Sequence, residues 1–288
     1  MNEKANKLPG SYPMNKGDGP FSYAQNSCYQ RGVVDAAKEM INAAITDKLD
    51  IKHLSFASLN AFYIADFGCS VGPNTFIAVQ NILDPVEFND TSQLAYLVHS
   101  TIAYFPRPPS ILYSSYALYW LSKVPKEVLD INPPTWNKGR IHYPGSAKEV
   151  VEAYSAQYAK DMESFLYARA QEVVDGGLMT LLIASLPDGI LHSHTTTVSE
   201  AKVDSFNLPI YYTSPKEFEA IIENNGYFSI ERMEKMDQPM RQATPNLQMC
   251  TLHMRAAMEG LIKEHFGSEI IENCSISTLR KMQSPPSS

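Results

Sequence analysis

The feature that most constrains the fold is a short apolar run that ends in a glycine-rich turn and leads directly into a helical pattern. Residues 61–65 (AFYIA) are apolar or aromatic, and the turn after them carries Asp66, Gly68 and Gly72. Residues 75–83 (TFIAVQNIL) then return to a helical period. This order predicts a strand, a loop and a helix. Glycines in such a loop allow the backbone to approach a ligand closely, because no side chain stands in the way.

The same alternation of strands and helices continues along the chain. Helical periodicity covers residues 27–49, 149–174, 216–223 and 254–266. Residues 178–186 (LMTLLIASL) predict a fully buried strand, and residues 227–233 alternate like another strand. Strands that alternate with helices indicate an α/β fold with a mainly parallel sheet. Its functional crevice is expected at the carboxyl ends of the strands, beside the glycine turn.

Composition excludes several classes of protein and partner. The formal net charge is −7 and the pI is near 5.5, whereas a nucleic-acid partner needs a cationic surface. The 4 cysteines form no CxxC pair, which predicts reduced thiols and no metal knuckle. The first twenty residues have no apolar core of a secretory signal, and no apolar run is long enough to span a membrane. A cytoplasmic protein is the expectation.

The glycine turn suggests what kind of ligand it binds. Its G-x-x-x-G spacing differs from the dinucleotide fingerprint, and the Lys-Ser/Thr of a P-loop is missing. Asp66 would repel phosphates but suits a ligand with an amino group and hydroxyls, such as S-adenosylmethionine. Because a Gly/Pro turn is also an ordinary structural feature of α/β folds, the spacing alone leaves both interpretations open.

Several separate motifs resemble those of the plant SABATH methyltransferases. They are residues 14–17 (MNKG), 21–27 (FSYAQNS), 64–74 (IADFGCSVGPN), 114–122 (SSYALYWLS), 136–140 (WNKGR) and 169–173 (RAQEV). Within the family, the chain is most similar to the branch of loganic acid and farnesoic acid carboxyl methyltransferases. That similarity is carried by residues 27–30 (SCYQ), 121–127 (LSKVPKE) and 202–209 (KVDSFNLP). The resemblance extends from residue 12 to about residue 271.

The resemblance implies S-adenosylmethionine-dependent methylation of a small plant carboxylic acid of the iridoid, terpenoid or phenolic type. It implies a Rossmann-like methyltransferase sheet with helices on both faces and a helical cap that is shortened here. The expected organisation is one methyltransferase domain over residues 1–288, with cap elements at about 130–160 and 188–260. A homodimer and a magnesium site are also typical of the family.

The motifs assign roles to particular residues. Those matching the methyl-donor site are Tyr23, Ser27, Asp66, Gly68, Cys69, Asn74, Asp90 and Ser100. Those matching the acceptor site are Gln30, Tyr116, Tyr119 and Trp120, of which Gln30 and Trp120 are the candidate catalytic residues. Those matching the magnesium site are Asn137, Asp204, Phe206 and Asn207.

The proposed chemistry depends on positioning. A carboxylate with a pKa of about 4.3 is already ionised at neutral pH, so its methylation needs no general base. The Gln30 amide and the Trp120 indole N–H are suitable donors for holding it in line with the methyl group. Trp120 also fits a core aromatic, and Asp90 a solvated turn residue. The pair His192 and His194 is more typical of a loop than of a metal site.

Four segments depart from the family pattern. Residues 84–89 are too few for a turn and a second strand, so Asp90 is expected to be displaced. The adenine segment is degraded in residues 100–106, the cap is short over 188–203, and the usual closing strand is replaced after residue 273. These departures leave open a non-catalytic paralogue. An N-methyltransferase of purine alkaloids from the same family is a second alternative, and a dehydrogenase is the most distant one.

Overall fold

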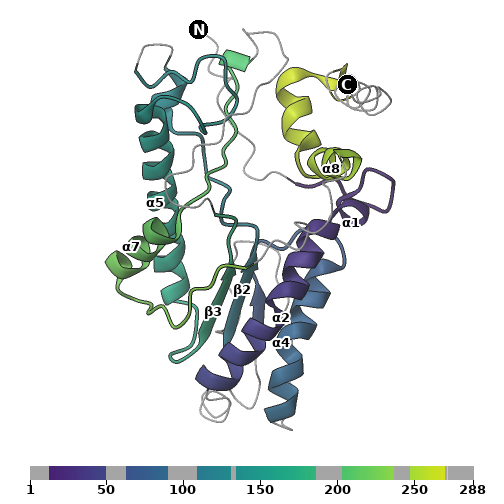
Figure 1. Cartoon of the computed structure of the whole chain (residues 1–288), viewed down its shortest axis with the longest axis vertical. Helices are drawn as coiled ribbons and strands as arrows, with labels where there is room; N and C mark the ends of the chain where they lie inside the picture. The colour runs from purple at the N-terminus through teal and green to yellow at the C-terminus, as the bar shows by residue number, and fades with distance from the viewer. Residues whose placement is uncertain are drawn as a thin grey trace, which may run out of the picture. The chain divides into compact units, whose positions relative to one another are not determined.

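The computed structural model describes residues 13–49, 63–89, 109–130, 134–185, 203–236, 247–269 and 271. Its helices are α1 (Tyr23–Asn26), α2 (Cys28–Lys48), α4 (Asn74–Asn89), α5 (Lys148–Ala170), α7 (Pro215–Asn225) and α8 (Leu247–Phe266), with the 3-10 helix η2 at Lys126–Leu129. Its strands are β1 (Ile64–Asp66), β2 (Ile111–Ser115) and β3 (Leu178–Leu182), as Figure 1 shows.

The chain divides into two compact units. The first contains Met1–Asp47, Cys69–Asn89 and Glu234–Ser288, and the second contains Lys48–Gly68 and Asp90–Met233. The glycine loop crosses from the second unit to the first between Gly68 and Cys69. The single methyltransferase domain over residues 1–288, with its two cap elements, stays a prediction.

The second unit contains the sheet. Its three strands are parallel in the order β1-β2-β3, with Asp66 opposite Tyr113 and Ser115 opposite Leu182. The parallel sheet is therefore confirmed. The prediction of a fully buried third strand is wrong, because only Leu182 of β3 is buried and its other four residues are half-buried. In the described part of the chain β3 lies at one edge of the sheet, where one side of the strand has no neighbour.

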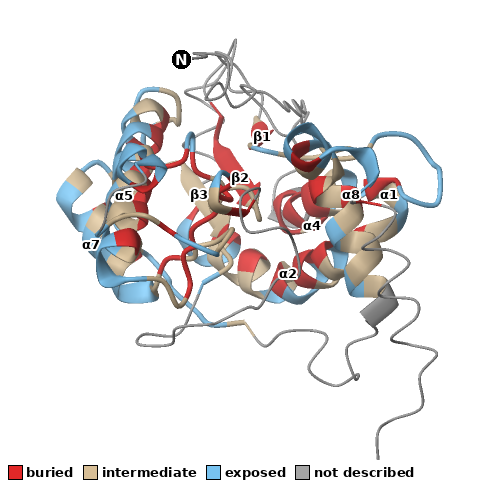
Figure 2. Cartoon of the chain, turned by 90° about the horizontal axis from the view of Figure 1, so that it is seen from above, coloured by how far each residue is buried: buried red, intermediate tan, exposed pale blue. Residues whose placement is uncertain are grey.

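Helices α5 and α7 lie side by side in the second unit (Figure 1). Figure 2 shows that α5 buries one face, which carries Tyr154, Tyr158 and Leu166. Helix α7 begins with a reciprocal capping box between Ser214 and Glu217 and ends at Gly226, whose φ is +71°. Both ends of α7 thus satisfy backbone groups that a bare helix end leaves without partners.

Four elements differ from the sequence-based expectation, one of them α8, which begins at Leu247 instead of residue 254. Helix α5 ends at Ala170, because the chain already turns at residues 171–177. Residues 227–233 form no strand: the chain is irregular there, with Tyr227 and Met233 exposed. Helix α4 continues to Asn89 instead of ending near Leu83, so no second strand lies within residues 84–89.

The extension of α4 is supported by a tertiary contact in the first unit, where α2 and α4 run side by side (Figure 1). Pro85 lies inside α4 and has no N–H for the Asn81 carbonyl one turn earlier. With its amide turned so that both polar atoms are satisfied, Asn42 of α2 donates to the Asn81 carbonyl at 2.9 Å and to the Lys38 carbonyl at 3.2 Å. A side chain of α2 therefore replaces the hydrogen bond that Pro85 removes.

Candidate active site

The first half of the glycine loop packs closely within the second unit. Gly68 has a φ of +75°, and a Cβ there would lie 2.4 Å from the Cβ of Ala117. The Phe67 N–H donates to the Tyr113 carbonyl at 2.8 Å, which continues the β1–β2 pairing into the loop. Asp66, at the carboxyl end of β1, is only 3% exposed. Glycine is therefore required at position 68 both by the backbone conformation and by the neighbouring alanine.

A buried arginine supports this part of the loop. The guanidinium of Arg169, near the end of α5, lies 4.7 Å from the centre of the Phe67 ring and 5.3 Å from that of Phe165. Arg169 also forms a 2.7 Å ion pair with Glu172 and is itself only 3% exposed. Arg169, the first residue of the 169–173 motif, thus contacts the first half of the donor loop through a cation–π interaction with Phe67.

The second half of the loop packs within the first unit. Gly72 has a φ of +125°, and a Cβ there would lie 3.2 Å from the Cα of Ala24 in α1. Asn74, the first residue of α4, donates to the Ser27 hydroxyl at 3.0 Å and to the Ser27 carbonyl at 3.2 Å. The structure therefore brings together Tyr23, Ser27 and Asn74, which the sequence assigned to the methyl donor. Cys69 is half-buried and, like Cys28 and Cys250, forms no disulfide.

The acceptor motif forms an aromatic cluster directly after β2. Tyr116 has a φ of +55° and donates its N–H to the Leu182 carbonyl at 2.9 Å. The Tyr119 ring lies edge-on to Tyr116 at 6.2 Å, stacks on Trp120 at 5.8 Å and packs against Tyr212 at 5.7 Å. A positive φ is unusual for an aromatic residue and is retained where the surrounding structure enforces it, often at a functional site. The three residues assigned to the acceptor are thus held in one cluster.

Gln30, the other acceptor residue, lies in the first unit and binds a residue that the sequence did not single out. Its side chain is 7% exposed, and its Nε2 lies 3.0 Å from Nε2 of His253 in α8. The Nδ1 atom of His253 lies 3.0 Å from the Asn26 carbonyl. The Tyr23 ring is 6.2 Å from the His253 ring, and burial raises the pKa of Tyr23 to about 12. Burial lowers the pKa of His253, so its ring is neutral at physiological pH.

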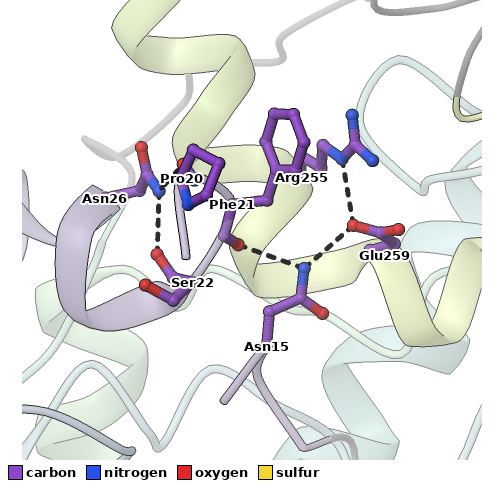
Figure 3. Close-up of polar contacts among 7 residues, drawn as sticks. All are labelled: Asn15, Pro20, Phe21, Ser22, Asn26, Arg255 and Glu259. Carbon is purple, nitrogen blue, oxygen red and sulfur yellow. Dashed lines mark hydrogen bonds and ion pairs between the residues drawn. The ribbon is translucent and has the colours of Figure 1, made fainter. Parts of the chain in front are cut away.

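Residues near the start of the described chain bind side chains of α8, the helix that carries His253 (Figure 3). The Asn15 amide donates to the Glu259 carboxylate at 2.9 Å and to the Phe21 carbonyl at 3.2 Å. Arg255 forms a 3.0 Å ion pair with Glu259, and its guanidinium lies 3.6 Å from the centre of the Phe21 ring. Asn15 and Phe21 therefore contact Glu259 and Arg255 of α8, the helix that also carries His253.

The four residues assigned to magnesium lie close together in the second unit. The Asn137 amide donates to the Asn207 side-chain oxygen at 2.9 Å, and the Ser146 hydroxyl donates to the Asn137 oxygen at 2.5 Å. The Asp204 carboxylate accepts the Gly139 N–H at 2.6 Å. The Oδ1 atoms of Asn137 and Asn207 and one oxygen of Asp204 thus accept hydrogen bonds from protein donors. No cluster of three His, Cys, Asp or Glu side chains suited to a metal ion occurs among the described residues.

This arrangement uses, as acceptors for protein donors, oxygens of a type that binds magnesium. It fits a structural tie between residues 137–146 and 204–208, reinforced by the Leu208 N–H, which donates to the Ile141 carbonyl at 2.7 Å. The assignment of magnesium to these residues stays a prediction. Asp90, Ser100, His192 and His194 lie outside the described residues.

A parallel sheet, a glycine loop that begins with an acid and an aromatic segment after β2 are the features that the resemblance to α/β methyltransferases predicts. A family model described as "SAM dependent carboxyl methyltransferase" matches residues 10–99 and 105–286. The chain therefore belongs to this family, the SABATH methyltransferases, and its methyl donor is S-adenosylmethionine. The resemblance predicted from the motifs is confirmed.

Individual relatives agree with this assignment. The chain is 41% identical over 317 residues to loganic acid O-methyltransferase of Catharanthus roseus, which covers 91% of this chain and 85% of the relative. It is 36% identical over 321 residues to farnesoic acid carboxyl-O-methyltransferase of Arabidopsis thaliana, covering 91% and 90%. A solved structure, loganic acid methyltransferase with SAH, matches with a TM-score of 0.84 and 39% identity, covering 94% of this chain and 92% of that one. The Rossmann-like α/β fold is thereby confirmed.

Among the helices of the described segments, none is long and apolar enough to cross a membrane.

Proposed function

We propose that this methyltransferase converts a small plant carboxylic acid of the iridoid, terpenoid or phenolic type into its methyl ester. The similarity to enzymes named for loganic acid and farnesoic acid supports an acceptor of this class. The aromatic cluster of Tyr116, Tyr119 and Trp120 supports it further, because flat aromatic side chains bind an apolar carbon skeleton.

The reaction requires little acid–base chemistry from the protein. S-adenosylmethionine supplies an activated methyl group on its sulfonium. One oxygen of the acceptor carboxylate forms the new C–O bond as the S–CH₃ bond breaks, which leaves the methyl ester and S-adenosylhomocysteine. The carboxylate is ionised at neutral pH, so no proton has to be removed. The task of the side chains is to hold this oxygen in line with the methyl group, and good orientation supplies about 7–11 kcal/mol.

The observation that carries the proposal is the buried Gln30 amide. Its carbonyl Oε1 is buried and has no hydrogen-bond partner among the described residues, although its Nε2 lies 3.0 Å from Nε2 of His253. A buried polar atom without a partner is costly unless a ligand completes its hydrogen bonding. An ionised carboxylate only accepts hydrogen bonds, so we assign its contact to the second N–H of the Gln30 amide, together with the Trp120 indole N–H. The Oε1 atom is then available to a donor group elsewhere on a ligand. We assign to Tyr23, Ser27, Asp66, Gly68, Cys69 and Asn74 the contact with the methyl donor.

A panel of plant acids incubated with S-adenosylmethionine, with methyl esters detected by mass spectrometry, tests the proposal. We expect at least one acid to be esterified, and we expect Gln30→Ala and Trp120→Ala to lower kcat/KM for that acid by 10-fold or more. Tyr167→Ala is a matched control, because Tyr167 is 56% exposed on α5. Donor binding by calorimetry without any ester would contradict the proposal and favour a non-catalytic paralogue. Methylation of a xanthine but no acid would favour an N-methyltransferase.

We propose further that the enzyme is a cytoplasmic homodimer. The support is the family resemblance together with 3 cysteines that form no disulfide in the described chain. Light scattering on the purified chain tests the oligomeric state: a mass of about 64 kDa, twice the 32.2 kDa of the chain, is expected, and a monomeric mass would contradict it.

A further inference from the structure

The contacts of His253 fix which of its ring nitrogens carries the proton. Its Nδ1 is 3.0 Å from the Asn26 carbonyl, which can only accept a hydrogen bond. Nδ1 must therefore carry the hydrogen. A neutral ring has one N–H, so Nε2 is left as an acceptor. The atom it faces, at 3.0 Å, is Nε2 of Gln30, which is a donor.

The orientation of the Gln30 amide follows from this proton. An amide side chain has two orientations that exchange its NH₂ group and its carbonyl oxygen. Only the orientation with NH₂ toward His253 pairs a donor with an acceptor. In that orientation one Gln30 N–H is used by His253, whereas the second N–H and Oε1 are left for a ligand, in agreement with the unpartnered Oε1.

We propose that His253 is a positioning residue for methyl transfer: it orients the Gln30 amide so that one N–H is available to the acceptor carboxylate. This inference rests on the proposed function. The chain Asn26–His253–Gln30 joins α1, α8 and α2, so each end of the ring is anchored on a different element. The Tyr23 ring packs beside the imidazole and limits its rotation.

The arrangement predicts a dependence on pH. Protonation of His253 would place a hydrogen on Nε2 opposite the Gln30 NH₂ group, so the amide would turn and present Oε1 to the ring. In the described part of the chain, the groups recorded against the ring are Asn26 and Gln30, which do not titrate, and Tyr23, whose pKa of about 12 keeps it neutral. Because burial lowers the pKa of His253, the neutral ring and the oriented amide persist at neutral pH.

Two substitutions of His253 distinguish the role of its Nε2 atom from the role of its Nδ1 atom. In His253→Gln the side-chain carbonyl reaches the place of Nε2 and supplies a permanent acceptor for Gln30. In His253→Asn the shorter amide keeps a donor near the Asn26 carbonyl but no longer reaches Gln30. We expect His253→Asn to lower kcat/KM for the acid by about 10- to 100-fold, the effect of losing one hydrogen bond to a charged group, and His253→Gln to retain most activity. His265→Asn, on the exposed last turn of the same helix, is the control.

The readouts distinguish positioning from a general structural role. We expect the affinity for S-adenosylhomocysteine and the melting temperature of His253→Asn and His253→Gln to be alike, with the loss in His253→Asn confined to kcat and to the KM of the acid. We also expect the acidic limb of the pH profile of kcat/KM to move to lower pH in His253→Gln, because this variant has no ring that becomes protonated. Equal activity of the two variants, when Gln30→Ala is impaired, would overturn the inference. If Gln30→Ala is itself fully active, the proposed function of Gln30 fails instead.

Discussion

Gly68→Ala is expected to destabilise the enzyme more than the same change at Gly176, although both glycines have a φ of +75°. A Cβ at Gly68 would lie 2.4 Å from the Cβ of Ala117, whereas a Cβ at Gly176 meets nothing within 4 Å. The left-handed backbone costs alanine about 1–2 kcal/mol at either position, and overpacking adds about 1–3 kcal/mol at Gly68 alone. The expected losses in free energy of unfolding are thus about 1–2 kcal/mol for Gly176→Ala and about 2–5 kcal/mol for Gly68→Ala.

Urea unfolding of both variants at one pH measures these losses. A third variant, Gly68→Ala with Ala117→Gly, removes the overlapping methyl group and should bring the loss back to the level of Gly176→Ala. Calorimetry with S-adenosylhomocysteine should show weaker binding in Gly68→Ala only, since the displaced loop follows Asp66. Equal losses at the two glycines, or no recovery with Ala117→Gly, would refute the steric reasoning.

Three further predictions concern other contacts. Arg255→Ala removes the ion pair with Glu259 and the cation–π contact, so it should cost about 1–2 kcal/mol and speed proteolysis within residues 13–22; an unchanged cleavage rate would contradict the role of this contact. The pKa of His253 is lower in the folded than in the unfolded chain, so the unfolded chain binds the proton more tightly. The free energy of unfolding should therefore fall as the pH drops below about 6.5. Urea midpoints at pH 5 and 8 should differ less in His253→Gln than in the unchanged protein. Asn137→Ala should cost about 1–3 kcal/mol by leaving buried polar atoms unpaired, whereas EDTA should leave the melting temperature unchanged; a melting temperature that rises with added magnesium would show that a metal occupies this region.

The elements with strong local patterns were predictable from the sequence. The capping residues Ser214 and Gly226 mark the ends of α7, where the structure has a capping box and a left-handed terminus. The strand, loop and helix around Asp66 were also predicted, because apolar runs and glycines act within a few residues of where they stand. The candidate donor and acceptor residues came from motif resemblance instead. Spacing alone does not distinguish a ligand-binding turn from an ordinary one.

What the sequence did not predict depends on partners that are distant along the chain. Pro85 is a local signal to end a helix, yet α4 continues because Asn42 of α2 donates to the carbonyl that Pro85 leaves without a partner. His253 also depends on a distant partner. In the sequence it is one histidine within an amphipathic helix, and its contact with Gln30 spans 223 positions. In both cases the residue type permits the contact, but only the tertiary packing selects it. A side chain that supports a catalytic group through such a contact leaves no spacing pattern.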